Sequence, residues 1–188
     1  MTTRDIVSVA FLALLVFWAV GAYNRLVRLK NAMGDAFVAI DFPLKDRHDL
    51  VLKLVEAASE YLQHDPSTLT ELMQARNTVS SASDAVRARP GNVRLVQALM
   101  SAEQRLHDQF DALWAVAADN LALQAEPKIR ELAQQITQTQ GKLNFACQAF
   151  NGLVTQYNSA RRQFPTALVS RLFGFVAAVP LSLGENST

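Results

Sequence analysis

The stretch that decides the fold is Tyr23–Glu56, YNRLVRLKNAMGDAFVAIDFPLKDRHDLVLKLVE. Its apolar side chains recur at steps of three and four, the spacing that gathers them on one face of an α-helix. This stripe, which includes one arginine, continues past the stretch and comprises Leu26, Leu29, Met33, Ala36, Ile40, Leu44, Arg47, Val51, Leu54, Ala58 and Tyr61. Pro43 lacks the N–H that a helix interior needs, so either one helix bends there or a second helix begins with Asp41 as its N-cap. Because the stripe keeps its phase across the proline, we expect one bent helix.

The segment before this stretch is apolar and uncharged. Ile6–Ala22 reads IVSVAFLALLVFWAVGA, and a helix of this length extends about 25 Å, near the hydrocarbon thickness of a bilayer. We therefore predict that residues 1–22 form a transmembrane anchor that contacts lipid through residues 6–22. The alternative is a cleaved signal peptide that releases an exported soluble bundle.

The charges that flank the apolar segment predict its orientation. Arg25, Arg28 and Lys30 follow the segment, whereas Arg4 and the terminal amine precede it. By the positive-inside rule the C-terminal domain lies in the cytoplasm. The sequence thus predicts a single-pass protein of the inner (plasma) membrane.

Three more helices are predicted after the first, which is expected to cover residues 23–64. Turn-forming residues separate them: His64-Asp65-Pro66, Arg89-Pro90-Gly91-Asn92 and Glu126-Pro127. Asp65 and Asn92 are suited to cap the helices that follow them. The expected ranges are 66–88, 93–124 and 127–164, and the apolar stripe of the third helix runs from Leu95 to Leu121.

The fourth helix has the most regular pattern. Its seam positions alternate steps of three and four, as in a heptad repeat: Ile129, Leu132, Ile136, Thr139, Leu143, Ala146, Phe150, Leu153, Tyr157, Ala160 and Phe164. Such a seam is typical of coiled coils and of long helices that pack near 20° in a bundle. We expect the first and fourth helices to pack along much of their length, with Phe150 in the core.

The whole chain is therefore predicted to be all-α: an N-terminal transmembrane helix followed by an antiparallel bundle of about four long helices at residues 23–165. Half of the 188 residues are apolar and Gly and Pro are few, which favours helices over an all-β fold. Residues 166–188 form an apolar tail with Arg171 inside it. We expect the tail to pack over the end of the bundle, and the alternative is an interfacial helix that contacts lipid.

Several short motifs carry a resemblance to a known family. They are Tyr23-Asn24-Arg25-Leu26-Val27, Ile40-Asp41, Leu44-Lys45-Asp46-Arg47-His48-Asp49-Leu50, Gln74-Ala75-Arg76, Tyr157-Asn158, Gln163-Phe164-Pro165 and Leu172-Phe173-Gly174-Phe175. On these motifs the chain resembles the LemA family over residues 23–175, and Arg47-His48-Asp49-Leu50 is the most specific of them. The resemblance implies a bacterial, membrane-anchored helical bundle whose molecular role is poorly defined. The chain departs from the family pattern at Pro43, Leu52-Lys53, Gln140 and Cys147, the last two standing where the family has Glu and Arg.

Five polar residues lie on or beside the predicted stripes and are the candidate site: Asp41, Arg47, His48, Asp49 and Arg76. A buried arginine needs a partner, because an unpaired buried charge is very costly. We therefore interpret the five as a structural network that ties the first helix to the second, with a ligand site as the alternative. Arg76 is expected to be at least half buried and hydrogen-bonded to a carboxylate, with Asp41 or Asp49 as its leading partner.

Catalytic patterns are weak in this sequence. Three His-Asp pairs, His48-Asp49, His64-Asp65 and His107-Asp108, leave a hydrolase or metal-binding protein as the alternative. However, neighbouring residues on a helix point about 100° apart, and no HExxH spacing, GxSxG elbow or Gly-rich phosphate loop is present. The single Cys147 on a helix seam is expected to be inert, and a net charge of +1 gives no reason to expect nucleic acid. We expect no catalytic, cofactor or metal site, and a non-enzymatic scaffold or adaptor at the membrane that binds protein partners the sequence does not identify.

Overall fold

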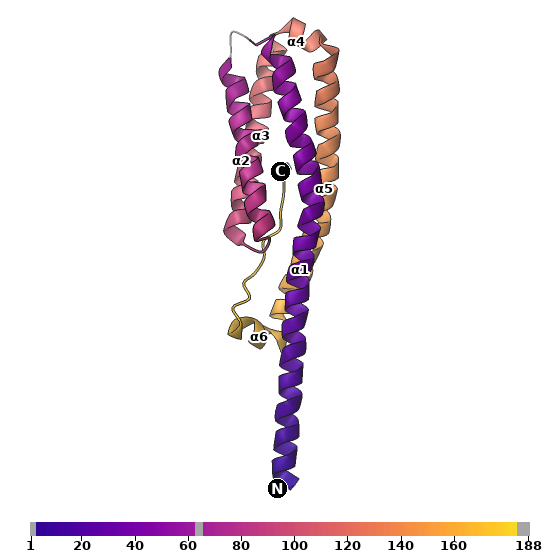
Figure 1. Ribbon diagram of the computed structural model, residues 1–188, viewed down its shortest axis with the longest axis vertical. Helices are drawn as coiled ribbons and strands as arrows, with labels where there is room; N and C mark the ends of the chain where they lie inside the picture. The colour runs from indigo at the N-terminus through magenta and orange to yellow at the C-terminus, as the bar shows by residue number, and fades with distance from the viewer. Residues whose placement is uncertain (1–2, 63–65, 184–188) are drawn as a thin grey trace.

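The computed structural model describes residues 3–62 and 66–183, which form six helices and no β-strand. The helices are α1 (Thr3–Ser59), α2 (Pro66–Ala88), α3 (Val93–Ala118), α4 (Leu121–Ala125), α5 (Pro127–Arg162) and α6 (Thr166–Leu172). Figure 1 shows a long bundle from which the N-terminal part of α1 projects alone. The all-α prediction is confirmed.

The stretch around Pro43 is part of one continuous helix. α1 runs from the apolar N-terminal segment through Pro43 to Ser59, so the alternative of a second helix capped by Asp41 is wrong. The predicted stripe is the buried face of α1, with Leu26, Met33, Ile40, Leu44, Val51 and Leu54 fully enclosed. His64 and Asp65, the latter predicted to cap α2, lie outside the described residues.

The third predicted helix is divided in two. Asn92 caps α3 as expected, because its side chain accepts hydrogen bonds from the backbone N–H groups of Arg94 and Leu95. α3 then ends at Ala118 and Asn120 caps the separate short α4, accepting from Leu123 N at 3.0 Å. The Asn120 side chain competes with continuation of the helix, as cap residues do. Leu121, predicted on the buried stripe, is consequently exposed.

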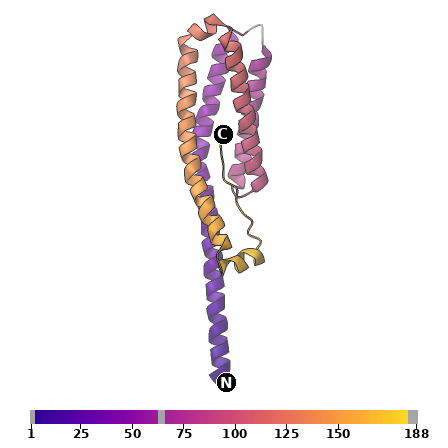
Figure 2. The ribbon, with the colours of Figure 1, turned by 180° about the vertical axis from the view of Figure 1, so that it is seen from behind.

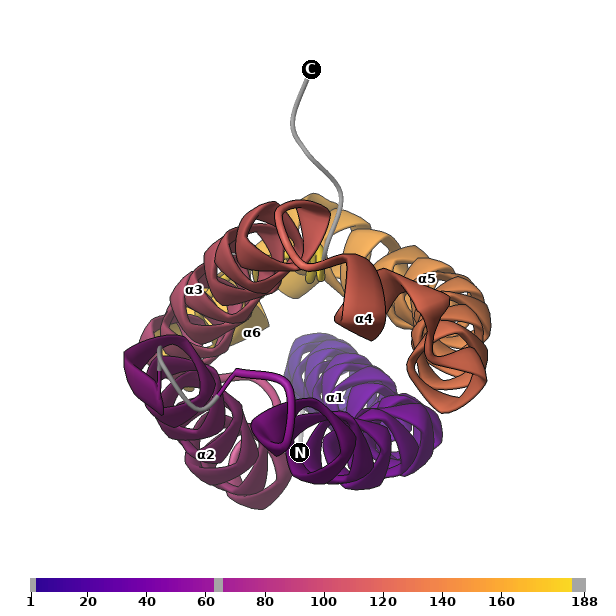
Figure 3. The same ribbon diagram turned by 90° about the horizontal axis from the view of Figure 1, so that it is seen from above.

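The long helices form two antiparallel pairs. α1 packs along α5, α2 packs along α3, and α1 against α2 joins the pairs. Seen from behind and from above, α3 and α5 stand on either side of a seam (Figures 2 and 3). α4 closes the end of this seam that lies far from the anchor, contacting both helices.

The heptad seam of α5 faces α1, as predicted. Phe150 is fully enclosed and packs edge-on against Phe37 of α1, with ring centroids 6.2 Å apart. Ile136 and Leu153 are partly buried. Phe164, predicted as the last seam position, is exposed because α5 ends at Arg162.

The C-terminal tail has two parts with different environments. α6 lies against α1 and α5, and Gly174 then turns the chain with a left-handed φ of 68°, which glycine adopts without strain. Residues 175–183 are extended, with Ala178, Leu181 and Leu183 buried in the core. The expectation that the tail packs on the bundle therefore describes residues 175–183, whereas α6 exposes Leu168 and Leu172.

Candidate functional site

The seam between α3 and α5 is filled near the anchor by the extended tail (Figures 2 and 3). Two asparagines of α5 each bind the backbone of one tail residue through both ends of the side-chain amide. Asn158 Nδ2 donates to Ala178 O at 2.8 Å and Asn158 Oδ1 accepts from Ala178 N at 3.0 Å. Asn151 repeats this pattern with Leu181 O at 2.8 Å and Leu181 N at 2.7 Å. The tail is thus held as an added strand would be, except that helix side chains replace the neighbouring strand.

The asparagine contact can repeat because the spacing of the two asparagines along α5 matches the spacing of the two bound residues along the tail. Asn151 and Asn158 are seven residues apart, which is a rise of about 10.5 Å along an α-helix. Ala178 and Leu181 are three residues apart, which is about 10 Å along an extended chain. The same face of α5 continues through Asn144 to Thr137, and we name the part of the seam held by Asn151 and Asn158 the tail seat.

Beyond the tail seat, on the side away from the anchor, the seam opens into a cleft with a volume of about 290 Å³. Side chains of α3 and α5 form its two walls, and one residue of α1 contributes from behind: Arg47, Glu103, Leu106, His107, Phe110, Asp111, Trp114, Ala133, Ile136, Thr137 and Gln140. Both walls combine aromatic or aliphatic groups with a small set of polar groups, as in many ligand and peptide sites.

A buried ion pair lies in this cleft and joins α1 to α3. Arg47 Nη2 donates to Glu103 Oε1 on α3, and the two side chains are only 4% and 3% exposed. Arg47 Nη1 donates to Gln140 Oε1 on α5 at 2.7 Å, and Gln140 Nε2 donates to Leu183 O of the tail at 2.6 Å. Arg47 thus connects α1, α3 and α5, and through Gln140 the cleft is linked to the tail seat.

Gln140 contributes to the cleft without carrying a charge. Its side-chain oxygen accepts a hydrogen bond from Arg47 Nη1, and its side-chain nitrogen donates to Leu183 O. The counter-charge that Arg47 requires comes from Glu103.

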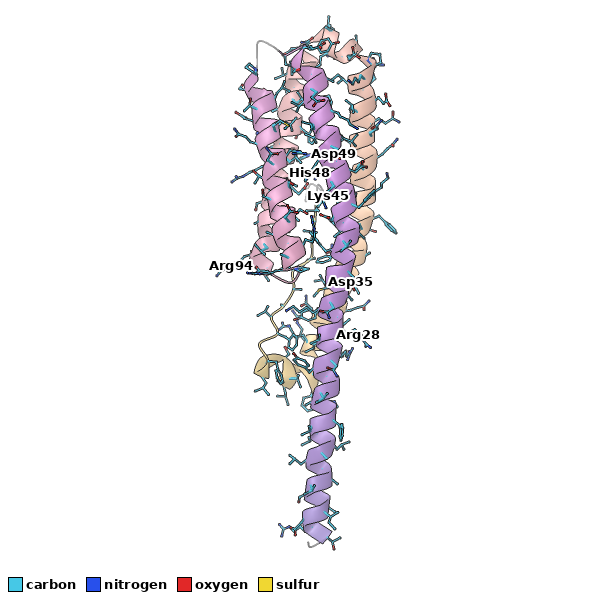
Figure 4. All side chains as sticks on the ribbon, viewed as in Figure 1. Arg28, Asp35, Lys45, His48, Asp49 and Arg94 are labelled. Atoms are coloured by element: carbon cyan, nitrogen blue, oxygen red, sulfur yellow. The ribbon has the colours of Figure 1, made fainter. Side chains whose placement is uncertain are left out.

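His48 is buried beside Arg47, and Nε2 has no hydrogen-bond partner among the described residues. Burial, together with the charges of Arg47 and Arg76, lowers the pKa of His48 to about 4. His48 is therefore neutral at neutral pH and acts as a packed side chain. Figure 4 shows His48 with Lys45 and Asp49 at mid-height of the bundle, far from Arg28 near its base.

Asp41 makes one ion pair that joins α1 to α2 and a second within α1. Its carboxylate accepts from Arg87 Nη2 of α2 at 2.6 Å and from Lys45 Nζ at 2.9 Å. Burial alone would raise the pKa of Asp41, but the hydrogen bonds and charges of Lys45 and Arg87 hold this pKa below its usual value. The first two helices are thus linked by a carboxylate–arginine pair, although the arginine is not the predicted one.

The predicted partner of Arg76 is wrong. Arg76 is largely buried, but its Nε donates to the backbone oxygen of His48 at 3.3 Å and its Nη1 to Asn77 Oδ1 at 2.9 Å. Asp41 is taken by Arg87, and Asp49 is exposed on α1. The five candidate residues therefore form separate contacts, centred on Arg47, on Asp41 and on the His48 carbonyl.

Glu103 and Arg87 are the charged partners that sequence reasoning missed. A signal existed for Glu103, which lies four residues after Leu99 and three before Leu106 and so belongs to the buried stripe of α3. An acid at such a position predicts a buried cation facing it. Arg87 carried no comparable signal, because it follows the buried Val86 on the exposed edge of α2.

The titratable side chains considered for chemistry are dispersed over the described residues. Across residues 3–62 and 66–183, no three His, Cys, Asp or Glu side chains gather where they could hold a metal ion. His107 and Asp111 pair loosely at 3.8 Å on the cleft rim, and Cys147 is buried on α5. Within the cleft, the charges of Arg47 and Glu103 neutralise each other.

Comparison with known proteins gives one family. The LemA family model matches residues 36–188, which include the Arg47 cleft, the tail seat and the tail. No curated protein matches the chain.

Proposed function

Because the chain belongs to the LemA family, we propose that it is a non-enzymatic scaffold or adaptor, anchored in the inner membrane, whose bundle binds protein partners in the cytoplasm. The observation that carries the proposal is the contrast within α1. Its N-terminal segment is long and apolar enough to cross a membrane and is almost entirely unburied. A core helix of a soluble protein would bury such a segment.

The junction between segment and bundle supports an anchor over a cleaved signal. Ala22 is buried, and the ring of Tyr23 packs against Phe173 and Phe175 with centroids 5.0 and 5.6 Å apart. Signal cleavage near residues 19–22 would cut α1 within a continuous helix, next to these contacts. The exposed Arg25, Arg28 and Lys30 on the bundle side of the segment favour a cytoplasmic domain.

The cleft supports a binding role and gives it a place. Phe110, Trp114 and Ile136 supply apolar surface, while Thr137 and Gln140 supply hydrogen-bonding groups. The tail seat, in the same seam, already holds an extended backbone by side-chain amides. A partner segment bound in the cleft would continue this mode of contact.

The anchor is tested by fractionation. We expect full-length protein to resist carbonate washing of membranes and N-terminal sequencing to begin at Met1. A reporter fused after Thr188 should behave as intracellular. Mature protein that starts near residue 22, or alkaline phosphatase activity of the fusion, would reverse the placement.

Partner binding is tested with a photocrosslinking amino acid. Placed at Trp114, on the cleft wall, it should capture a discrete protein in cell membranes. The matched control is Phe145, an exposed aromatic residue of α5 that does not line the cleft. Equal capture from both positions, or capture from neither, contradicts an adaptor role for the cleft.

A further inference from the structure

The anchor-side end of the bundle carries an unusual combination of exposed apolar and basic side chains. We propose that this basal surface lies on the membrane and binds the headgroups of anionic lipids, an inference that rests on the proposed anchor. The surface comprises apolar Phe164, Leu168, Leu172, Phe173 and Val176, together with Arg25, Arg28, Arg162 and Arg171.

The basal surface lies where the anchor ends. α6 packs against both α1 and α5. The ring of Phe173 packs at a tilt against that of Tyr23, the first residue after the apolar segment, with centroids 5.0 Å apart. Figure 1 shows α6 beside α1 at the point where the lone N-terminal part begins. Aromatic rings at this level match the headgroup region, where Tyr and Trp gather in membrane proteins. A bilayer that surrounds the anchor therefore meets α6.

The burial pattern of α6 leaves an apolar face uncovered. α6 buries Val169 together with the hydroxyl residues Thr166 and Ser170, and it exposes Leu168 and Leu172, which are one turn apart. Leu172 is 80% exposed. In water such a face is costly, whereas in a membrane interface the same leucines insert among the lipids. The apolar face of α6 is thus explained by a lipid surface.

The charge of this end is uniformly positive. The sequence contains no Asp or Glu in residues 6–34 or in residues 132–183, the two segments that make the basal surface. Arg25 Nη1 donates to the neutral Gln163 Oε1 at 3.4 Å. Arginines next to a bilayer attract anionic headgroups, and their position beside exposed leucines favours lipid over nucleic acid or an acidic protein.

The test uses the full chain in nanodiscs with an environment-sensitive NBD label. The label is attached at Leu172→Cys or, as a control of similar exposure, at Phe145→Cys, which is 76% exposed; Cys147→Ala removes the native thiol in both. We expect blue-shifted emission and quenching by nitroxide lipids of shallow depth at position 172, and neither at position 145. The effect at 172 should be larger in discs with phosphatidylglycerol than in pure phosphatidylcholine discs.

A charge variant separates lipid attraction from simple proximity. Arg162→Gln with Arg171→Gln should remove the dependence on phosphatidylglycerol, and Arg105→Gln with Arg130→Gln, on exposed sites away from α6, should preserve it. Emission typical of a water-exposed label at position 172 in both lipids overturns the inference. A blue shift without nitroxide quenching also overturns it, because that result would indicate contact with protein. Failure of the chain to enter discs at all would instead contradict the proposed anchor.

Discussion

The two sides of α5 meet their neighbours in different ways. Toward α1, α5 presents a largely apolar heptad seam in which Phe150 packs against Phe37. Toward α3, the contact is indirect and polar, through the tail held by Asn151 and Asn158 and through Arg47. We call these the apolar side and the polar side. The comparison teaches that α5 is stabilised against α1 by periodic apolar burial. Its position relative to α3 depends instead on a few specific hydrogen bonds.

The polar side breaks first at Arg47. Arg47→Ala leaves Glu103 buried without its counter-charge and should lower the free energy of unfolding by about 3–5 kcal/mol. The measurement is chemical unfolding of the full chain in detergent. Arg47→Met combined with Glu103→Leu should recover most of the loss, because an apolar pair of similar volume needs no partner. If the double variant were as unstable as the single one, the ion pair would not be the cause.

On the apolar side, Phe150→Ala should cost about 3–5 kcal/mol through lost burial and the cavity it leaves. Gln148, two residues away and exposed, tests the register of the seam. Gln148→Ala should change the free energy of unfolding by less than about 0.5 kcal/mol. Equal losses from the two substitutions in thermal melts would refute the heptad assignment.

These two sides also differ in how far the sequence predicted them. The apolar side follows from local spacing, and the predicted α2 and the start of α5 match the observed bounds. The polar side depends on residues far apart in sequence, such as Arg47 with Glu103 and Asn151 with Leu181. No local pattern specifies which arginine pairs with Asp41, and the pair is made by Arg87 instead of the expected Arg76.

Acid should lower the free energy of unfolding through His48, which is buried beside Arg47. Because its pKa is about 4 in the folded protein and about 6.5 in the unfolded chain, the unfolded state binds the proton first. The stability that neutral His48 contributes is complete above pH 6.5 and is lost as the pH falls toward 4, by up to about 1.4 kcal/mol per pH unit. Unfolding curves at pH 7 and pH 5 measure the loss. His48→Gln should flatten this dependence, and His107→Gln, on the half-exposed cleft rim, should not.

A substitution in the tail seat should have the smallest effect on the free energy of unfolding and a clear effect on local amide exchange. Asn151→Ala removes both bonds to the backbone of Leu181, and each bond is worth about 1 kcal/mol. Amide exchange should rise at residue 181 while exchange in α1 stays slow. Thr155→Ala on the same helix, exposed and bonded only to the Asn151 carbonyl, is the control. Unchanged exchange at residue 181 would mean that burial of Leu181, and not the amide pair, holds the tail.

The unbroken length of α1 gives the molecule a fixed reach. From Ala22, where the apolar segment ends, to Arg47 in the cleft is 25 residues of one helix, a rise of about 38 Å. In the proposed placement the cleft stands this far above the lipid, clear of the headgroups. A partner in the same membrane must span a similar height to enter it, whereas a soluble partner meets it without approaching the bilayer. In that placement the continuous helix would hold the cleft at a fixed height above the bilayer.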